Sequence, residues 1–74
     1  MTSSANAISA SEFFEAAIER FDNKEYRESA ILLKNALKQD PQHLPSRILL
    51  GKSLIHTGDV AGAEKDLKIA QQYG

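Results

Sequence analysis

Apolar residues recur every three or four positions along most of this chain, which is the spacing that forms one face of an α-helix. The first apolar segment, over about residues 10–21, carries two such stripes, so we expect its helix to contact two neighbours. A second segment covers about 26–39, a third has Pro45 in its first turn and ends before Gly58, and a fourth covers about 60–72. Because no segment has the period of two that a half-buried strand requires, the pattern predicts an all-α fold of four short helices.

Capping and turn residues mark where these helices begin and end. Ser9 and Glu12 have the spacing of a capping box at the start of the first helix. The Asp40-Pro41 pair stops the second helix, because the residue before a proline is pushed out of the helical region. Gly58 can supply the positive φ that ends the third helix, and Asp59 can cap the fourth. We therefore expect two hairpins of antiparallel helices.

The second hairpin repeats the first at a fixed interval along the sequence. This interval, which we call the repeat period, is the number of residues that separates Ala17 from Gly51. A shift of the chain by this period pairs residues of similar size: Ser29 with Ala63, Leu33 with Leu67 and Ala36 with Ala70. A helix-turn-helix unit of this period is the signature of the tetratricopeptide repeat (TPR), and the chain resembles a tandem pair of such repeats over about Ala10 to Tyr73. The residues that fit the family pattern best are Tyr26, Ala36-Leu37, Asp40-Pro41, Leu50-Gly51, Gly58-Asp59, Ala63 and Ala70.

The resemblance implies two tandem helix-turn-helix hairpins that form a fragment of a right-handed α-solenoid. A flexible N-terminal tail would cover residues 1–8 and a TPR domain residues 9–74, with repeat one over about 10–43 and repeat two over about 44–74. The segments 26–40 and 47–59 are also similar to the TPR proteins of bacterial exopolysaccharide and exosortase systems. Ala17 and Lys24 replace two usual glycines, and Arg47 replaces a large apolar residue, so we expect softer packing between helices.

Side-chain size at matched positions predicts how the hairpins pack. Small residues would let helix axes approach closely, at Ala17, Ser29, Ala36, Gly51, Ala63 and Ala70. Larger residues would fill the gaps, at Phe13, Tyr26, Leu33, Leu50, Leu54 and Leu67. Repeat arrays normally need at least three repeats for stability, so two repeats predict self-association into a homo-oligomer.

Composition and charge narrow the function classes. The chain has 74 residues, no cysteine and a formal net charge of -1. This length allows one small domain, without disulfides, and the charge argues against binding to nucleic acid or an anionic membrane. There is no apolar run of the ~20 residues that a membrane span needs, and no signal-peptide pattern at the start. We expect no membrane insertion, with a cytoplasmic location if the chain is complete and a periplasmic one if it is a fragment of an exported protein.

The family resemblance also indicates a binding surface, because the first helix of each TPR repeat lines a concave groove. The residues that fall there are Phe14, Ile18 and Phe21 in repeat one and Ile48, Lys52, Ile55 and His56 in repeat two. Apolar patches of about a few hundred Å² usually mark interaction sites, which predicts a protein-interaction scaffold that binds a peptide, a helix or a second copy through this groove and exposed helix edges. Two alternatives stay open. The N-terminal tail or a second copy covers these side chains, or the chain is a structural fragment of a longer array without binding activity.

One ligand class is disfavoured by the same positions. Phe14, Ile18 and Leu49 stand where TPR domains that bind chaperone C-termini carry carboxylate-clamp residues, so a ligand held by its terminal carboxylate is not expected. Chemistry is not expected either, because neither His43 nor His56 has a Ser, a Cys or a second His at useful helical spacing. We predict no catalytic, cofactor-binding or metal-binding residues, and a protein that is not an enzyme.

Charged residues distinguish the fourth helix from the second. The apolar Ala30, Ile31, Leu32 and Leu37 of the second helix correspond to Glu64, Lys65, Asp66 and Gln71 of the fourth. The fourth helix is therefore expected to face water on its outer side, as the terminal cap of an array does. The lysines of these two helices, Lys34, Lys38, Lys65 and Lys68, are interpreted as solubilising residues.

Overall fold

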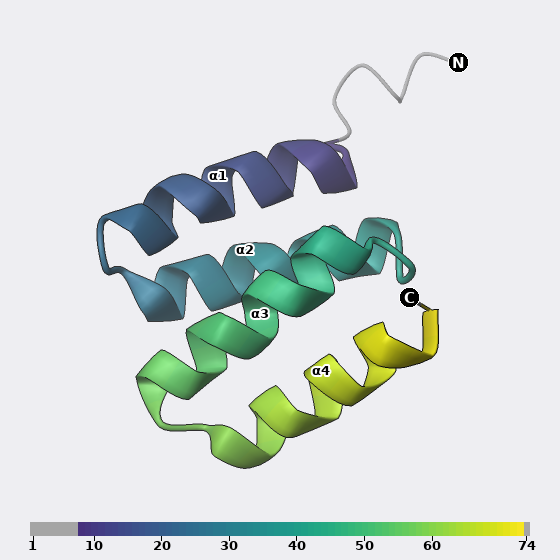
Figure 1. The fold of residues 1–74 in the computed structure, drawn as a ribbon. Coiled ribbons are helices and arrows are strands. Elements are labelled where there is room, and N and C mark those ends of the chain that lie inside the picture. Colours follow the sequence, from purple (N-terminus) through teal and green to yellow (C-terminus); the bar gives the residue numbers. More distant parts are fainter. Residues whose placement is uncertain (1–7, 74) are drawn as a thin grey trace.

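The computed structural model describes residues 8–73, and this range contains four helices and no strand. The helices are α1 (Ala10–Asp22), α2 (Tyr26–Gln39), α3 (Leu44–Thr57) and α4 (Val60–Tyr73), joined by short turns (Figure 1). The all-α fold is confirmed, and each helix begins and ends close to its predicted bounds. The predicted flexible tail lies, except for Ile8, outside the described residues.

The predicted capping residues form hydrogen bonds at two helix starts. At α1 the Glu12 amide donates to the Ser9 hydroxyl over 3.2 Å, and the Ser9 amide donates to the Glu12 carboxylate over 3.0 Å. At α4 the Gly62 amide donates to Asp59 Oδ1 over 2.9 Å. Gly58 ends α3 in the left-handed region with φ +93°. These helix ends are thus fixed by local chemistry.

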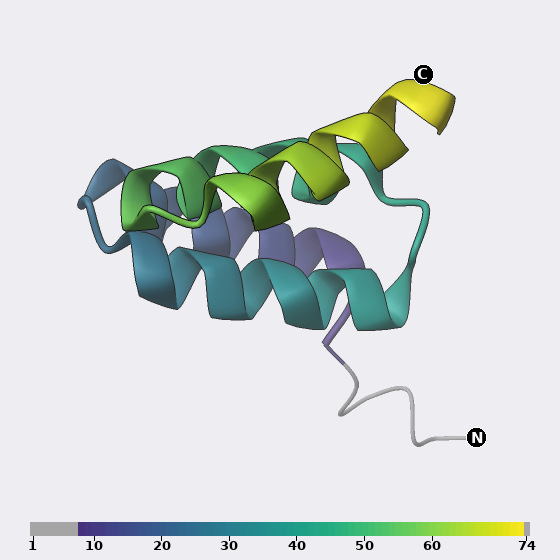
Figure 2. The same ribbon diagram turned by 90° about the horizontal axis from the view of Figure 1, so that it is seen from below.

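Each helix packs on the next one along the chain. α1 lies against α2, α2 against α3 and α3 against α4, and α1 also makes a small contact with α3. Figure 1 shows α3 crossing α2 at the centre, with α1 and α4 on the two outer sides, and Figure 2 shows the same four helices from below. Within the described residues, no Cα atom of α2 lies within 8 Å of a Cα atom of α4. The result is two helical hairpins stacked side by side, as the repeat predicted.

The small residues at the matched positions are buried between helices, which confirms the packing prediction. They are Ala17, Ser29, Ala36, Gly51, Ala63 and Ala70. Leu33, Leu50 and Leu54 fill the core between them, whereas Phe13, Tyr26 and Leu67 are only half-buried. A Cβ atom at Gly51 would lie 2.8 Å from Leu67 Cγ, so the closeness of α3 and α4 requires a glycine there.

Two buried serines join three helices. The Ser29 hydroxyl of α2 donates to the Ala17 carbonyl of α1 over 2.9 Å, and the Ser53 hydroxyl of α3 donates to Ser29 Oγ over 3.3 Å. Both serines are fully buried, and all buried side-chain nitrogen and oxygen atoms in the described residues have partners. Small polar side chains therefore allow close helix approach without leaving an unsatisfied hydroxyl.

The structure corrects the prediction for Asp66, which was expected to face water. Asp66 is buried, and its Oδ1 lies 3.1 Å from Arg47 Nη1, while Arg47 Nη2 donates to the Pro41 carbonyl over 3.0 Å. Glu64, Lys65 and Gln71 are exposed, as predicted. Arg47 and Asp66 both stand where repeat one has an apolar residue, and each neutralises the charge of the other. A buried carboxylate without such a partner would cost several kcal/mol, roughly 3–5.

Candidate functional site

Apolar side chains at equivalent positions of α1 and α3 form the candidate site. Phe14, Ile18 and Phe21 follow one another at the spacing of a single helix face, and a shift by one repeat period places them on Ile48, Lys52 and Ile55. Ile18, Ile48 and Ile55 are 37%, 41% and 51% exposed. α1 and α3 make a small contact, and Phe21 of the first stripe packs against His56 of α3 with ring centroids 5.6 Å apart. We call the surface formed by Phe14, Ile18, Phe21, Ile48, Lys52, Ile55 and His56 the inner face.

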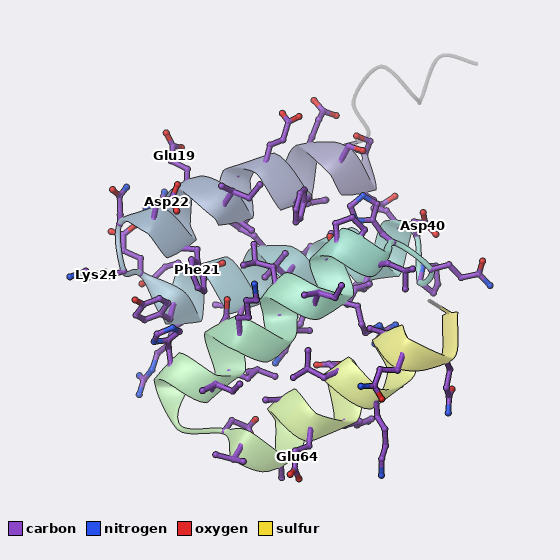
Figure 3. All side chains as sticks on the ribbon, viewed as in Figure 1. Glu19, Phe21, Asp22, Lys24, Asp40 and Glu64 are labelled. Atoms are coloured by element: carbon purple, nitrogen blue, oxygen red, sulfur yellow. The ribbon has the colours of Figure 1, made fainter. Side chains whose placement is uncertain are left out.

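Aromatic rings connect one end of the inner face to the start of α2. Phe21 packs edge-on against Tyr26 and His56, with ring centroids 5.1 and 5.6 Å apart, and Tyr26 stacks on His56 at 4.1 Å with planes 7° apart. Figure 3 shows Phe21 on the side of α1 toward α2, with Glu19 projecting away from the other helices. The stack joins repeat one to repeat two. The sequence analysis named Tyr26 as a packing residue and His56 as a groove residue, but it did not predict their contact. The contact forms because the start of α2 lies against the end of α3.

The other end of the inner face rests on the loop before α3. Phe14 packs edge-on against the His43 ring with centroids 5.4 Å apart. His43 Nδ1 lies 2.7 Å from Ser46 Oγ, and Ser46 is fully buried. The prediction that His43 has no serine at useful helical spacing was therefore wrong. The pair fixes the first turn of α3 and holds the His43 ring beside Phe14.

A scan against family models decides the family. Residues 20–70 match the model described as tetratricopeptide repeat, and this segment is more than half of the chain. The chain belongs to the tetratricopeptide repeat family. A comparison with curated proteins found no match, and neither did a comparison with solved structures. TPR repeats are generally modules of protein–protein interaction, and the family is typically non-enzymatic.

Not all predicted site residues of this TPR pair come together in one hollow. His56 lines a pocket of about 450 Å³ at the joint between the repeats, beside the α2 start at Tyr26 and Arg27. Ile48 lines another pocket of about 330 Å³ with Leu67, Ala70 and Gln71, at the free edge of repeat two. The inner face is therefore a broad surface that extends from the joint to this edge.

An exposed ion pair spans the turn between α1 and α2. Arg20 Nη1 donates to Glu25 Oε1 over 2.9 Å, and this hydrogen bond, together with the Glu25 charge, raises the pKa of Arg20. In residues 8–73 there is no group of three or more His, Asp or Glu side chains that could hold a metal ion. Nor does the described part of the chain contain a helix of the length and apolarity that crossing a bilayer requires.

Proposed function

We propose that this TPR pair is a protein-interaction scaffold whose inner face binds a peptide or helix of a partner protein. The observation that carries the proposal is the exposure of Ile18, Ile48 and Ile55 on adjacent helices. Isolated exposed apolar residues are common on protein surfaces, but a contiguous group rimmed by polar residues is typical of an interaction site.

The shape of the inner face favours a helix or short peptide with apolar anchors. Its side chains are spaced by one helical turn along both α1 and α3, which matches anchors at i, i+4 and i+7 of a bound segment. Lys52 stands between Ile48 and Ile55 and can bind a polar group of the partner. Since His43 supports Phe14 and Tyr26 supports Phe21, the platform is ordered before binding, which lowers the entropy cost of association.

A second copy of the chain is the second candidate partner, and the free edge of repeat two supports it. The pocket there is formed by Ile48, Leu67, Ala70 and Gln71. Their counterparts one repeat period earlier are Phe14, Leu33, Ala36 and Leu37, which are buried or pack against the core. The same edge is where a further repeat would stack if the chain acts as a structural part of a longer array.

The test replaces exposed residues only, so that folding is preserved. In the double variant Ile18→Ser with Ile55→Ser we expect partner capture by crosslinking from position 52 to be lost, while helicity by circular dichroism is unchanged. Phe14 is a poorer choice, since it is half-buried and packs against the core.

A matched control variant tests whether loss of capture is specific to the inner face. Ile8 and Val60 are 49% and 57% exposed and lie outside the inner face, so Ile8→Ser with Val60→Ser removes a similar amount of apolar surface elsewhere. We expect this control to capture the same partner as the unmodified chain. Equal capture by both double variants would show that the inner face is not the binding surface.

A further inference from the structure

A second groove lies on a different side of the molecule, between α2 and α4. Because no Cα atoms of these helices approach within 8 Å in the described residues, α3 forms the floor between them. One pocket of about 360 Å³ is lined by Ile31 and Lys34 of α2 and Leu54 of α3. A neighbouring pocket of about 350 Å³ also contains Lys34 and Leu54 and extends to Lys65 of α4. The two pockets adjoin at Lys34 and Leu54, and we call the surface that they form together the outer groove.

The floor and one wall of the outer groove are apolar. Leu50 and Leu54 line the floor, and Leu37 lies half-buried at the wall formed by α2. Ile31 is 60% exposed, the highest value among the large apolar side chains described, although it stands beside buried Ala30. An exposed isoleucine on a hollowed apolar surface gives a ligand a place to bury its own apolar side chain.

Cations without acidic partners rim this apolar surface. Arg27 and Lys34 line it from α2 and Lys65 from α4, and no ion pair found within residues 8–73 involves any of the three. Of the two acids that line the groove, Asp66 pairs with Arg47, whereas Asp59 accepts the neutral Gly62 amide and keeps its charge against the three cations. The outer groove is therefore locally positive in a chain of net charge -1.

We propose that the outer groove binds an acidic amphipathic helix of a partner protein. Its apolar stripe would lie on Ile31 and Leu54, and its flanking carboxylates would meet Lys34 and Lys65. The wall from Arg27 to Leu37 on α2 is about 15 Å long at the rise of an α-helix, which sets a contact of about three helical turns. A nucleic acid fits this groove less well, because phosphates would cover Ile31 without burying it against an apolar group.

The experiment uses a synthetic peptide of about 14 residues, with leucines on one helical stripe and glutamates beside it, titrated into the full ¹⁵N-labelled chain. A matched peptide carries lysine in place of each glutamate. We expect the glutamate peptide to bind with shifted amide signals in α2 and around Leu54, and to bind at least about tenfold more tightly than the lysine peptide. Added salt should weaken binding of the glutamate peptide.

Variants at positions that are not buried locate the binding. Lys34→Glu with Lys65→Glu should weaken the glutamate peptide by more than about tenfold, and Ile31→Ser should weaken it as well. The control Lys52→Glu makes the same kind of charge change on the inner face and should alter affinity by less than about twofold. Ile18→Ser with Ile55→Ser should leave peptide binding intact, so the outer groove is tested separately from the inner face.

Several outcomes would overturn the proposal. These are no binding of the glutamate peptide at millimolar concentration, equal affinity for both peptides, or amide shifts confined to α1 and the inner face. A single-stranded oligonucleotide that displaces the peptide with equal affinity would also overturn it, because the groove would then be a general anion site.

Discussion

At the residue scale, two positions one repeat period apart adopt the left-handed backbone conformation. Lys24 has φ +65° and Gly58 has φ +93°. Left-handed φ costs a residue with a Cβ atom about 1–2 kcal/mol, whereas glycine bears no such cost but loses roughly 0.5–1 kcal/mol of additional chain entropy. The turn after α1 therefore stores strain that the turn after α3 avoids. The replacement of the usual family glycine by Lys24 therefore has a cost in backbone strain.

We expect Lys24→Gly to stabilise the fold by about 0.5 kcal/mol, the difference between these two terms. For a domain of this size the thermal midpoint would rise by about 2–4 °C. The reciprocal change Gly58→Ala should destabilise by a similar amount, about 0.5–1 kcal/mol, for backbone reasons alone, because a Cβ atom there meets no atom of the described residues within 4 Å. Thermal and urea unfolding measure both effects, and a lower midpoint for Lys24→Gly would contradict the strain explanation.

Residue-scale features were predictable from the sequence where they depend on neighbours in the chain. The Ser9–Glu12 capping box and the φ of Gly58 follow from residues within a few positions. The role of Asp66 was not predictable in this way, because its partner Arg47 lies on another helix and each residue alone resembles a solvated charge. Only the observation that Arg47 stands at an apolar position could have indicated a buried partner.

At the element scale, the approach of α3 to α4 depends on Gly51. A Cβ atom there would lie 2.8 Å from Leu67 Cγ and 2.9 Å from Leu67 Cδ2, with the Ala63 carbonyl at 3.5 Å. The near atom is the branching carbon of Leu67, which cannot move aside as the tip of a long side chain can. An alanine would gain about 1 kcal/mol in helix propensity, but overpacking costs about 1–3 kcal/mol. The second term is the larger.

We therefore expect Gly51→Ala to destabilise the fold by about 1 kcal/mol net. The double variant Gly51→Ala with Leu67→Ala should lose less stability than the sum of the two single losses, by at least about 0.5 kcal/mol. The reason is that Leu67→Ala removes the atoms that the new Cβ would clash with. Urea unfolding of the four chains gives this coupling. Lys52→Ala, one position away and exposed, is the control and should stay within about 0.5 kcal/mol. Additive single effects would mean that Gly51 and Leu67 do not limit the helix approach.

At the scale of the whole molecule, the two edges and two faces differ in chemistry. The outward side of α1 carries the exposed carboxylates Glu12, Glu15 and Glu19, and Figure 3 shows Glu19 projecting away from the hairpins. The free edge of repeat two instead contains the pocket of Ile48 and Leu67. The repeat period was enough to predict the stacking order, since equivalent residues must have equivalent neighbours. It did not predict the outer groove, because that depends on the separation of α2 and α4.

This asymmetry leads to a prediction about self-association through the free edge. Gln71 lines the edge pocket, and its counterpart Leu37 packs on the core, so Gln71→Leu makes the edge resemble the covered surface of repeat one. Only folded chains associate through this edge, so association stabilises the folded state and the thermal midpoint of a homo-oligomer must rise with protein concentration. We expect a small rise for the unmodified chain, a larger one for Gln71→Leu and a smaller one for Gln71→Lys, with sedimentation velocity reporting mass. Gln72→Leu adds the same apolar group outside this pocket and should match the unmodified chain. A monomer with a constant midpoint at every concentration, in Gln71→Leu as well, would exclude a second copy as the partner at this edge.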